Sequence, residues 1–188
     1  MSDFTILFIH GYTASSKADF YPSLTPLLDT GGVDYVIPDL PGGKYPQAKV
    51  WLENIHKVIK RNSKPLIIVG HSLGTRAALL YIEKYQPKVE NLFLIAAFAN
   101  NLENAKRKGG EVYPDFFMHK INAEIIKDLV THSYVLHSKD DSSIPFEQGE
   151  DIAREINAEL IISADRDHFC ELSNAPYIYS VLKKKIGF

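Results

Sequence analysis

The sequence predicts an α/β fold: an open, mostly parallel, doubly wound sheet with helices on both of its faces. Two observations lead to this fold class. The short apolar segments are hydrophobic at successive rather than alternate positions, which is typical of strands buried on both faces. Amphipathic helical patterns separate these segments, and such alternation favours right-handed βαβ units. With 188 residues, no internal repeat and no long linker, the chain is expected to form one domain over residues 1–188.

Six apolar segments are expected as strands, and six helical patterns accompany them. The expected strands are residues 4–9, 35–37, 66–69, 91–97, 134–136 and 159–162. The expected helices are residues 24–28, 48–60, 73–85, 123–129, 146–156 and 177–185. The glycine pair 31–32 is a stop signal for the first helix. In the fifth helix, four apolar residues fall near one face: Phe146, Ile152, Ala153 and Ile156. The stretch from Asn100 to Lys120 has no clear period and predicts either a functional lid or a solvated surface excursion.

Composition excludes several classes of protein. An apolar content of 45% and a charged content of 23% are those of an ordinary globular protein. The net charge of −2 and the dispersed Lys and Arg residues give no footprint for nucleic acid. Cys170 is the only cysteine, which excludes an internal disulfide and a cysteine-based metal site. The apolar run at 4–9 is too short for a secretion signal or a membrane span, so we expect a cytoplasmic protein without a membrane anchor.

A G-x-S-x-G motif carries most of the functional prediction. Gly70, Ser72 and Gly74 follow the apolar strand at 66–69 and precede the helix at 73–85. A nucleophilic serine on a sharp strand-to-helix turn needs this context, because small neighbours let the helix and strand approach closely. The turn would present the Ser72 hydroxyl beyond the carboxyl end of its strand, where open α/β sheets bind ligands. The alternative is a structural serine that caps the helix.

Serine needs a base, and an acid and a histidine should follow it in that order. Asp141 comes after the strand that includes residues 134–136, and His168 lies in the loop after the last strand. We therefore predict Asp141 as the acid and His168 as the base, with Asp140 in a supporting or solvated role. The other six histidines are expected to be packed or on the surface, and the His71 side chain should project away from the Ser72 hydroxyl: His10, His56, His71, His119, His132 and His137.

An oxyanion hole requires two backbone N–H donors. Leu73, at the start of the helix, supplies one. The loop after the first strand is expected to supply the other from Tyr12, with Gly11 permitting a close approach; the alternative for Gly11 is an ordinary turn glycine. Cys170 adjoins neither a glycine-rich turn nor a helix N-terminus, so we expect it to pack beneath the His168 loop and to react slowly.

Together these motifs resemble the α/β-hydrolase superfamily. They are H-G-Y after the first strand, G-H-S-L-G, D-D-S-S-I-P-F and D-H-F. The short length is similar to that of small serine hydrolases related to retinoblastoma-binding protein nine and its bacterial relatives. The resemblance implies an α/β-hydrolase fold with minimal or no cap, a serine-hydrolase triad and no cofactor. It also implies that the acid lies four residues before Pro145, which is Asp141. Relatives often carry glycine just before the histidine, whereas this chain has Asp167.

The predicted function is hydrolysis of small carboxylic esters through an acyl-enzyme, with Ser72, His168 and Asp141 as the triad and a small-molecule ester as the partner. Because the fold and the triad do not choose the leaving group, a peptidase or a thioesterase remains open. A protein-binding module with a vestigial hydrolase site is the alternative from a different class. No metal or cofactor is expected.

Overall fold

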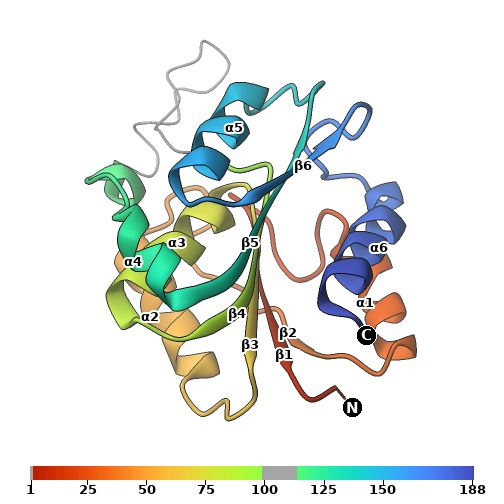
Figure 1. The fold of residues 1–188 in the computed structure, drawn as a ribbon, viewed down its shortest axis with the longest axis horizontal. Coiled ribbons are helices and arrows are strands. Elements are labelled where there is room, and N and C mark those ends of the chain that lie inside the picture. Colours follow the sequence, from red (N-terminus) through yellow and green to blue (C-terminus); the bar gives the residue numbers. More distant parts are fainter. Residues whose placement is uncertain (1, 99–113) are drawn as a thin grey trace.

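The computed structural model describes residues 2–98 and 114–188, and its centre is a six-stranded sheet (Figure 1). The strand order is β2-β1-β3-β4-β5-β6, and all five neighbouring pairs within the described residues are parallel. The strands are β1 Thr5–Ile9, β2 Asp34–Val36, β3 Leu66–His71, β4 Val89–Ile95, β5 Val130–Ser138 and β6 Glu159–Ser163. The predicted fold class is therefore confirmed.

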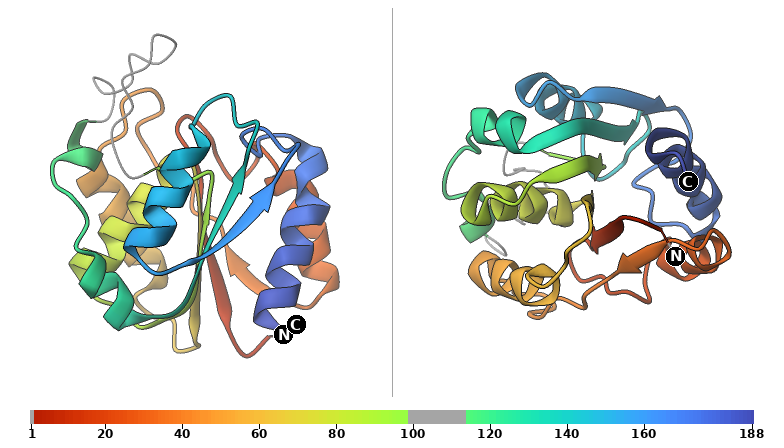
Figure 2. Two further views of the ribbon diagram at one scale, coloured as in Figure 1. Left: turned by 45° about the horizontal axis from the view of Figure 1, so that its top comes forward. Right: turned by 60° about the horizontal axis from the view of Figure 1, so that its bottom comes forward.

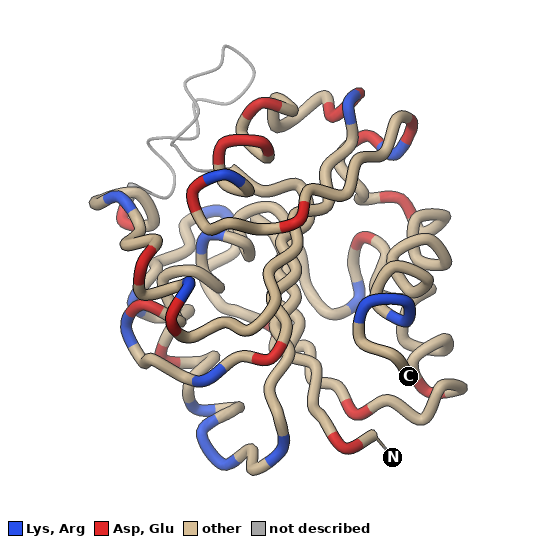
Figure 3. Tube along the Cα trace, viewed as in Figure 1, with Lys and Arg blue, Asp and Glu red and all other residues tan. Residues whose placement is uncertain are grey.

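Helices cover both faces of this sheet, as the two views in Figure 2 show. One face carries α1 and α6, which contact each other, and the other carries α2, α3, α4 and α5. The helices are α1 Tyr21–Thr30, α2 Ala48–Ile59, α3 Leu73–Tyr85, α4 Ala123–Leu129, α5 Phe146–Glu155 and α6 Ala175–Ile186. Among the described residues, no helix is long and apolar enough to cross a membrane. Basic and acidic residues are interspersed over the described part of the chain (Figure 3).

Side chains of β1 show why the strand segments are apolar at successive positions. Ile6 and Phe8 join the core beneath α1 and α6, whereas Leu7 and Ile9 join the core beneath the other helices. All four are fully buried. Neighbouring side chains of a strand point to opposite faces of the sheet. Because both faces are buried here, the residues on both faces are apolar, and the usual alternation of apolar and polar residues is absent.

The order of the strands reverses its direction of winding at β1 and β3. The chain passes from β1 outward to β2 and then returns to β3 on the other side of β1. In such a sheet, ligands bind where the direction of winding reverses. Ile9 and Gly70 are register partners there, so the loops that begin at His10 and at Ser72 start side by side.

The predicted elements and the observed ones differ mainly at their ends. The helices at 73–85 and 123–129 begin and end as predicted. The first helix is longer, because Pro22 sits in its first turn and it continues to Thr30. The strand β5 starts directly after α4, at Val130.

For the segment from Asn100 to Lys120, residues 100–113 lie outside the described residues. Residues Pro114–Phe117 form a 3-10 turn. Two contacts fix this turn to the helices beside it. The backbone N–H of Ala48 donates to Asp115, and the buried Arg76 guanidinium on α3 donates to the carbonyl of Phe116. The end of the segment is therefore held against the helix that begins at the G-x-S-x-G motif.

Candidate active site

Ser72 lies on the turn between β3 and α3 in a backbone conformation that is rare outside glycine. Its φ is 52° and its ψ is −121°. The backbone N–H of Ser72 donates to the carbonyl of Ile95 on β4, at 2.9 Å, which holds the turn to the sheet. No side-chain capping bond to α3 is present, so the helix-cap alternative for this serine is not supported. Residues held in sparsely populated conformations cluster at functional sites, where the surrounding structure maintains the strain.

The two motif glycines leave no room for a side chain. A Cβ on Gly74 would lie 2.1 Å from the carbonyl oxygen of Ile9, and a Cβ on Gly70 would lie 2.7 Å from the carbonyl oxygen of Gly74. Both obstacles are backbone atoms, which a side-chain rotation cannot remove. The first turn of α3 therefore packs directly on the ends of β1 and β3, as the sequence motif predicts.

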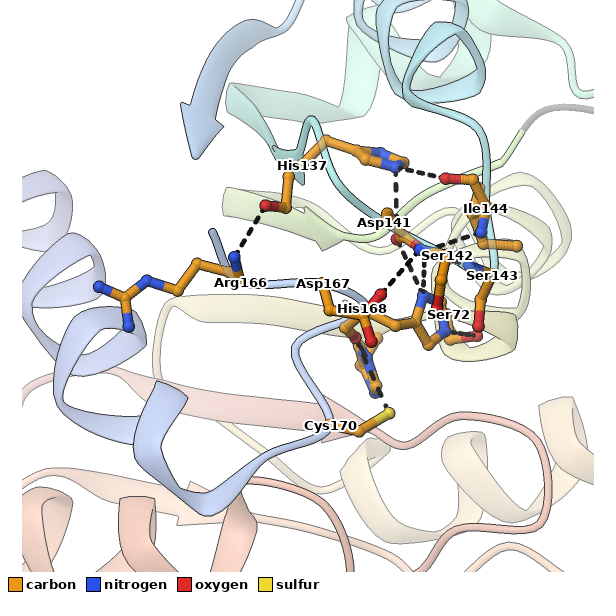
Figure 4. A network of polar contacts seen from close by, with 12 residues as sticks. Ser72, His137, Asp141, Ser142, Ser143, Ile144, Arg166, Asp167, His168 and Cys170 are labelled. Atoms are coloured by element: carbon orange, nitrogen blue, oxygen red, sulfur yellow. Dashed lines mark hydrogen bonds and ion pairs between the residues drawn. The ribbon is translucent and has the colours of Figure 1, made fainter. Parts of the chain in front are cut away.

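The structure brings Ser72, His168 and Asp141 together in one chain of polar contacts (Figure 4). Nε2 of His168 lies 2.9 Å from Oγ of Ser72. Nδ1 of His168 lies 2.9 Å from Oδ2 and 3.1 Å from Oδ1 of Asp141. Ser72 is 4% exposed, His168 is 6% exposed, and the Asp141 side chain is fully buried. These charges and dipoles therefore interact with little screening by water.

Backbone donors stabilise the buried Asp141 carboxylate. Its Oδ1 accepts the N–H groups of Ser143 and Ile144, both at 2.8 Å. Hydrogen bonds to the charged form of a carboxylate favour that form and offset the cost of burial. The turn after β5 thus orients the carboxylate toward the histidine.

His137 is a second histidine at this acid, and the sequence reasoning did not assign it there. It is fully buried on β5, its Nε2 lies 3.1 Å from the carbonyl oxygen of Ile144, and the same nitrogen lies 3.5 Å from Oδ2 of Asp141. Burial lowers the pKa of His137, which favours the neutral ring at neutral pH. The ring thus contacts the Asp141 carboxylate without adding a positive charge. No sequence pattern indicates this contact, because Asp141 lies beyond the end of β5, in the turn that follows the strand.

Asp140 contacts the loop that carries the histidine rather than the histidine ring. Its Oδ1 accepts the Ser138 hydroxyl at 2.5 Å and the Asp167 N–H at 3.0 Å. The bond from Ser138 holds the pKa of the Asp140 carboxyl below its usual value. The structure therefore places Asp141, and not Asp140, against His168, in agreement with the sequence prediction.

Asp167 explains how this chain dispenses with the glycine that precedes the histidine in relatives. Its φ is 44°, a left-handed conformation that glycine adopts freely and that Asp tolerates better than most residues. Its carboxylate accepts the backbone N–H of Ser142 at 2.7 Å, and this bond lowers the pKa of the Asp167 carboxyl. The side chain thus ties the acid turn to the histidine loop.

The two predicted oxyanion donors lie at the same edge of the sheet as Ser72. A Cβ on Gly11 would lie 3.2 Å from Cβ of Ser72, so the loop after β1 passes directly beside the serine. His10 anchors this loop, because its Nε2 accepts the N–H of Leu40 at 2.9 Å and its Nδ1 lies 2.8 Å from the carbonyl oxygen of Gly11. Tyr12 follows in that loop, and Leu73 is the first residue of α3.

His71 forms a hydrogen bond with the backbone of the loop that carries His168. It is 1% exposed, and its Nε2 donates to the carbonyl oxygen of His168 at 2.8 Å. On the other side of the ring, Nδ1 lies 3.5 Å from Oδ2 of Asp19. Of the two environments expected for His71, packed or on the surface, the structure shows the packed one. Its contact with His168 was not foreseen. Nothing in the sequence links residues 71 and 168, which the fold alone brings together.

Cys170 corrects a sequence expectation, because the residue is exposed rather than packed beneath the loop. Its Sγ still faces inward and lies 3.8 Å from the carbonyl oxygen of His168. Desolvation of the sulfur, followed by the nearby Asp19 carboxylate, raises the pKa of the Cys170 thiol to about 12. The thiolate, which is the reactive form, is therefore scarce at neutral pH.

We expect Cys170→Ala to keep full activity and native Cys170 to react slowly with iodoacetamide at pH 8, because the raised pKa keeps the thiol protonated. Alkylation is followed by intact mass, and activity is measured in parallel. Rapid inactivation that substrate prevents, and that is absent in Cys170→Ala, would show that the thiol takes part in the chemistry.

Comparisons with known proteins identify the family of the chain. Residues 6–183 match the serine hydrolase family. The chain is 29% identical to YdeN of Bacillus subtilis over 182 residues, which cover 94% of this chain and 93% of YdeN. It is 31% identical to the serine hydrolase RBBP9 of Rattus norvegicus over 122 residues, or 64% of this chain and 61% of RBBP9.

Solved structures extend the comparison to the fold. The crystal structure of the YdeN gene product superposes with a TM-score of 0.87 at 27% identity, covering 98% of this chain and 100% of that one. Est1E from Butyrivibrio proteoclasticus superposes with a TM-score of 0.76 at 15% identity, covering 97% and 86% of the two chains. At that identity the second likeness concerns the fold alone.

Proposed function

The chain belongs to the serine hydrolase family, and we propose that it hydrolyses small carboxylic esters through an acyl-enzyme formed on Ser72. The observation that carries this proposal is the continuous path from the Ser72 hydroxyl through His168 to the buried Asp141 carboxylate. We call these three residues the proposed triad. An isolated serine hydroxyl is a weak nucleophile, and a base within hydrogen-bond reach is what activates it.

Each member of the proposed triad has a distinct task. Nδ1–H of His168 donates to Asp141, which leaves Nε2 unprotonated and directed at the Ser72 hydroxyl. As Oγ attacks the substrate carbonyl, its proton passes to Nε2, and Asp141 stabilises the imidazolium that results. The histidine then gives this proton to the leaving alkoxide. A water molecule, deprotonated by the same nitrogen, releases the acid from the acyl-enzyme.

The oxyanion that forms during attack requires donors on the other side of the serine. We assign the backbone N–H groups of Leu73 and Tyr12 to this task. Leu73 opens α3, whose N-terminal dipole favours negative charge, and the closeness of Gly11 to Ser72 brings the Tyr12 loop beside the reacting atom. Removing one such donor typically costs on the order of 10²–10³ in kcat.

Activity should rise with pH and level off in the alkaline range, with an apparent pKa near neutrality. The sign follows from the base: His168 accepts a proton only when it is neutral, so the active fraction grows as the imidazolium loses its proton. Initial rates on a neutral ester between pH 5 and pH 9 measure this profile. A flat profile would show that no histidine acts as the base.

The substrate class is tested by a matched panel. Acetyl, butyryl and octanoyl groups are each offered as an ester, a thioester and an anilide, and kcat/KM is compared across the panel. We expect short esters to give the highest values. A preference for thioesters or anilides would make the protein a thioesterase or a peptidase with the same mechanism. No turnover of any substrate would favour a protein-binding role with a vestigial site.

A further inference from the structure

Three potential metal ligands lie close together at the proposed triad, and one of them is its histidine. Among the described residues, His71, His168 and Cys170 each offer one donor atom to a metal ion, and these three atoms lie within 4.8 Å of one another. A carboxylate oxygen of Asp19 lies 3.5 Å from Nδ1 of His71. The sequence on its own excludes a cysteine-based metal site, because Cys170 is the only cysteine. The fold changes that expectation, since it places two imidazoles and a carboxylate near this single sulfur.

A buried ring nitrogen of His71, Nδ1, points to a bound ligand. Its partner nitrogen Nε2 must carry the ring proton, because it faces the carbonyl oxygen of His168 at 2.8 Å. The other nitrogen of the ring, Nδ1, has no hydrogen bond of ordinary geometry within the described residues. Oδ2 of Asp19 lies 3.5 Å from this nitrogen. A cation between the two atoms would accept a lone pair from each of them.

We propose that Nδ1 of His71, Sγ of Cys170, the Asp19 carboxylate and one ring nitrogen of His168 form a binding site for Zn²⁺. Nitrogen, sulfur and oxygen donors in a set of four are the ligands that Zn²⁺ takes in tetrahedral sites. Binding deprotonates the Cys170 thiol, its proton passes to the buffer, and a zinc–thiolate bond forms.

The ligands need only a small rearrangement. Donor atoms around a tetrahedral Zn²⁺ are about 3.3–3.8 Å apart, given bonds of about 2.0–2.3 Å. The donor atoms of His71, His168 and Cys170 lie within 4.8 Å of one another, so this spread closes by about 1–1.5 Å, and Asp19 approaches from its place 3.5 Å from His71. Cys170 is exposed and can supply this movement by rotation of its side chain, whereas the buried His71 stays in place.

Occupancy of this site would switch the hydrolase off. Both ring nitrogens of His168 are engaged, one with Ser72 and the other with Asp141. A metal ion that takes either nitrogen breaks the path from the serine to the carboxylate. Zn²⁺ is therefore a reversible inhibitor of the enzyme rather than a cofactor, and this consequence rests on the proposed function.

Binding is tested first, without reference to activity. Isothermal calorimetry with ZnCl₂ is performed on the Ser72→Ala protein, alone and combined with Cys170→Ser or Asp19→Asn. We expect one site per chain and at least about tenfold weaker binding in both combined variants, as is common when a metal site loses a supporting group. His119→Gln is the matched control, because that exposed histidine pairs with Glu83 away from the site; it should leave the affinity unchanged.

Inhibition is tested next on the wild-type protein in metal-free buffer. We expect Zn²⁺ to abolish ester hydrolysis, a chelator to restore it, and Cys170→Ser to require at least about tenfold more Zn²⁺ while its basal rate stays unchanged. Equal Zn²⁺ binding with and without Cys170, or no binding at all, would overturn the site. Cysteine-dependent binding without inhibition would overturn the link to His168. A chelated wild-type protein without activity would instead contradict the proposed function.

Discussion

Ser72→Ala is expected to reduce kcat on ester substrates by a factor on the order of 10⁵–10⁶, which is the scale found when a serine hydrolase loses its nucleophile. The alanine removes the hydroxyl that lies 2.9 Å from His168 and leaves the backbone of the turn unchanged. Initial rates measured with purified protein, together with circular dichroism and thermal unfolding, separate the loss of chemistry from a loss of structure.

Ser72→Gly gives this prediction a matched companion. The glycine variant should be as inactive as Ser72→Ala. Its free energy of unfolding should be about 1 kcal/mol higher than that of Ser72→Ala, because glycine adopts the positive φ of this turn without steric cost. Residual activity of a tenth or more in Ser72→Ala would contradict the assignment of the nucleophile. If Ser72→Ala lost its folded structure together with its activity, the loss of activity would come from the altered turn and not from the missing hydroxyl.

Asp141→Asn is expected to lower kcat by a factor on the order of 10⁴. An asparagine can offer its N–H₂ group to Nδ1 of His168, which then favours the tautomer whose protonated Nε2 cannot accept the Ser72 proton. The change is nearly isosteric, and the backbone donors from Ser143 and Ile144 still find an oxygen. The fold should therefore persist while the chemistry is lost.

The neighbouring acid is the control for this experiment. Asp140→Asn alters the contacts with Ser138 and Asp167 but not the atoms that touch His168. It should lose far less activity than Asp141→Asn, and its effect should come through looser positioning of the histidine loop. Equal losses, or a larger loss at Asp140, would reverse the roles of the two carboxylates.

The fold class and the three polar residues could be predicted because each has a local signal. Apolar residues at successive positions mark strands buried on both faces, and G-x-S-x-G between a strand and a helix marks the turn at Ser72. The acid and the base follow from their position after later strands. The parallel order of those strands then brings their carboxyl ends together.

The supporting contacts could not be predicted, because they depend on how turns and distant segments meet in the fold and not on a local sequence pattern. His71 meets the backbone of His168 across 97 positions of the chain. His137 contacts Asp141 only because the turn after β5 folds back on its own strand. Cys170 is exposed, and Phe169 before it has a left-handed φ of 60° that no sequence pattern indicates.

Labelling by a fluorophosphonate probe shows whether Ser72 is an activated nucleophile. We expect one probe per wild-type chain, located by peptide mass spectrometry on the peptide at Ser72. Labelling should be absent in Ser72→Ala and strongly slowed in Asp141→Asn. If a folded wild-type protein takes up no probe, or takes it up at another residue, Ser72 is not the activated nucleophile.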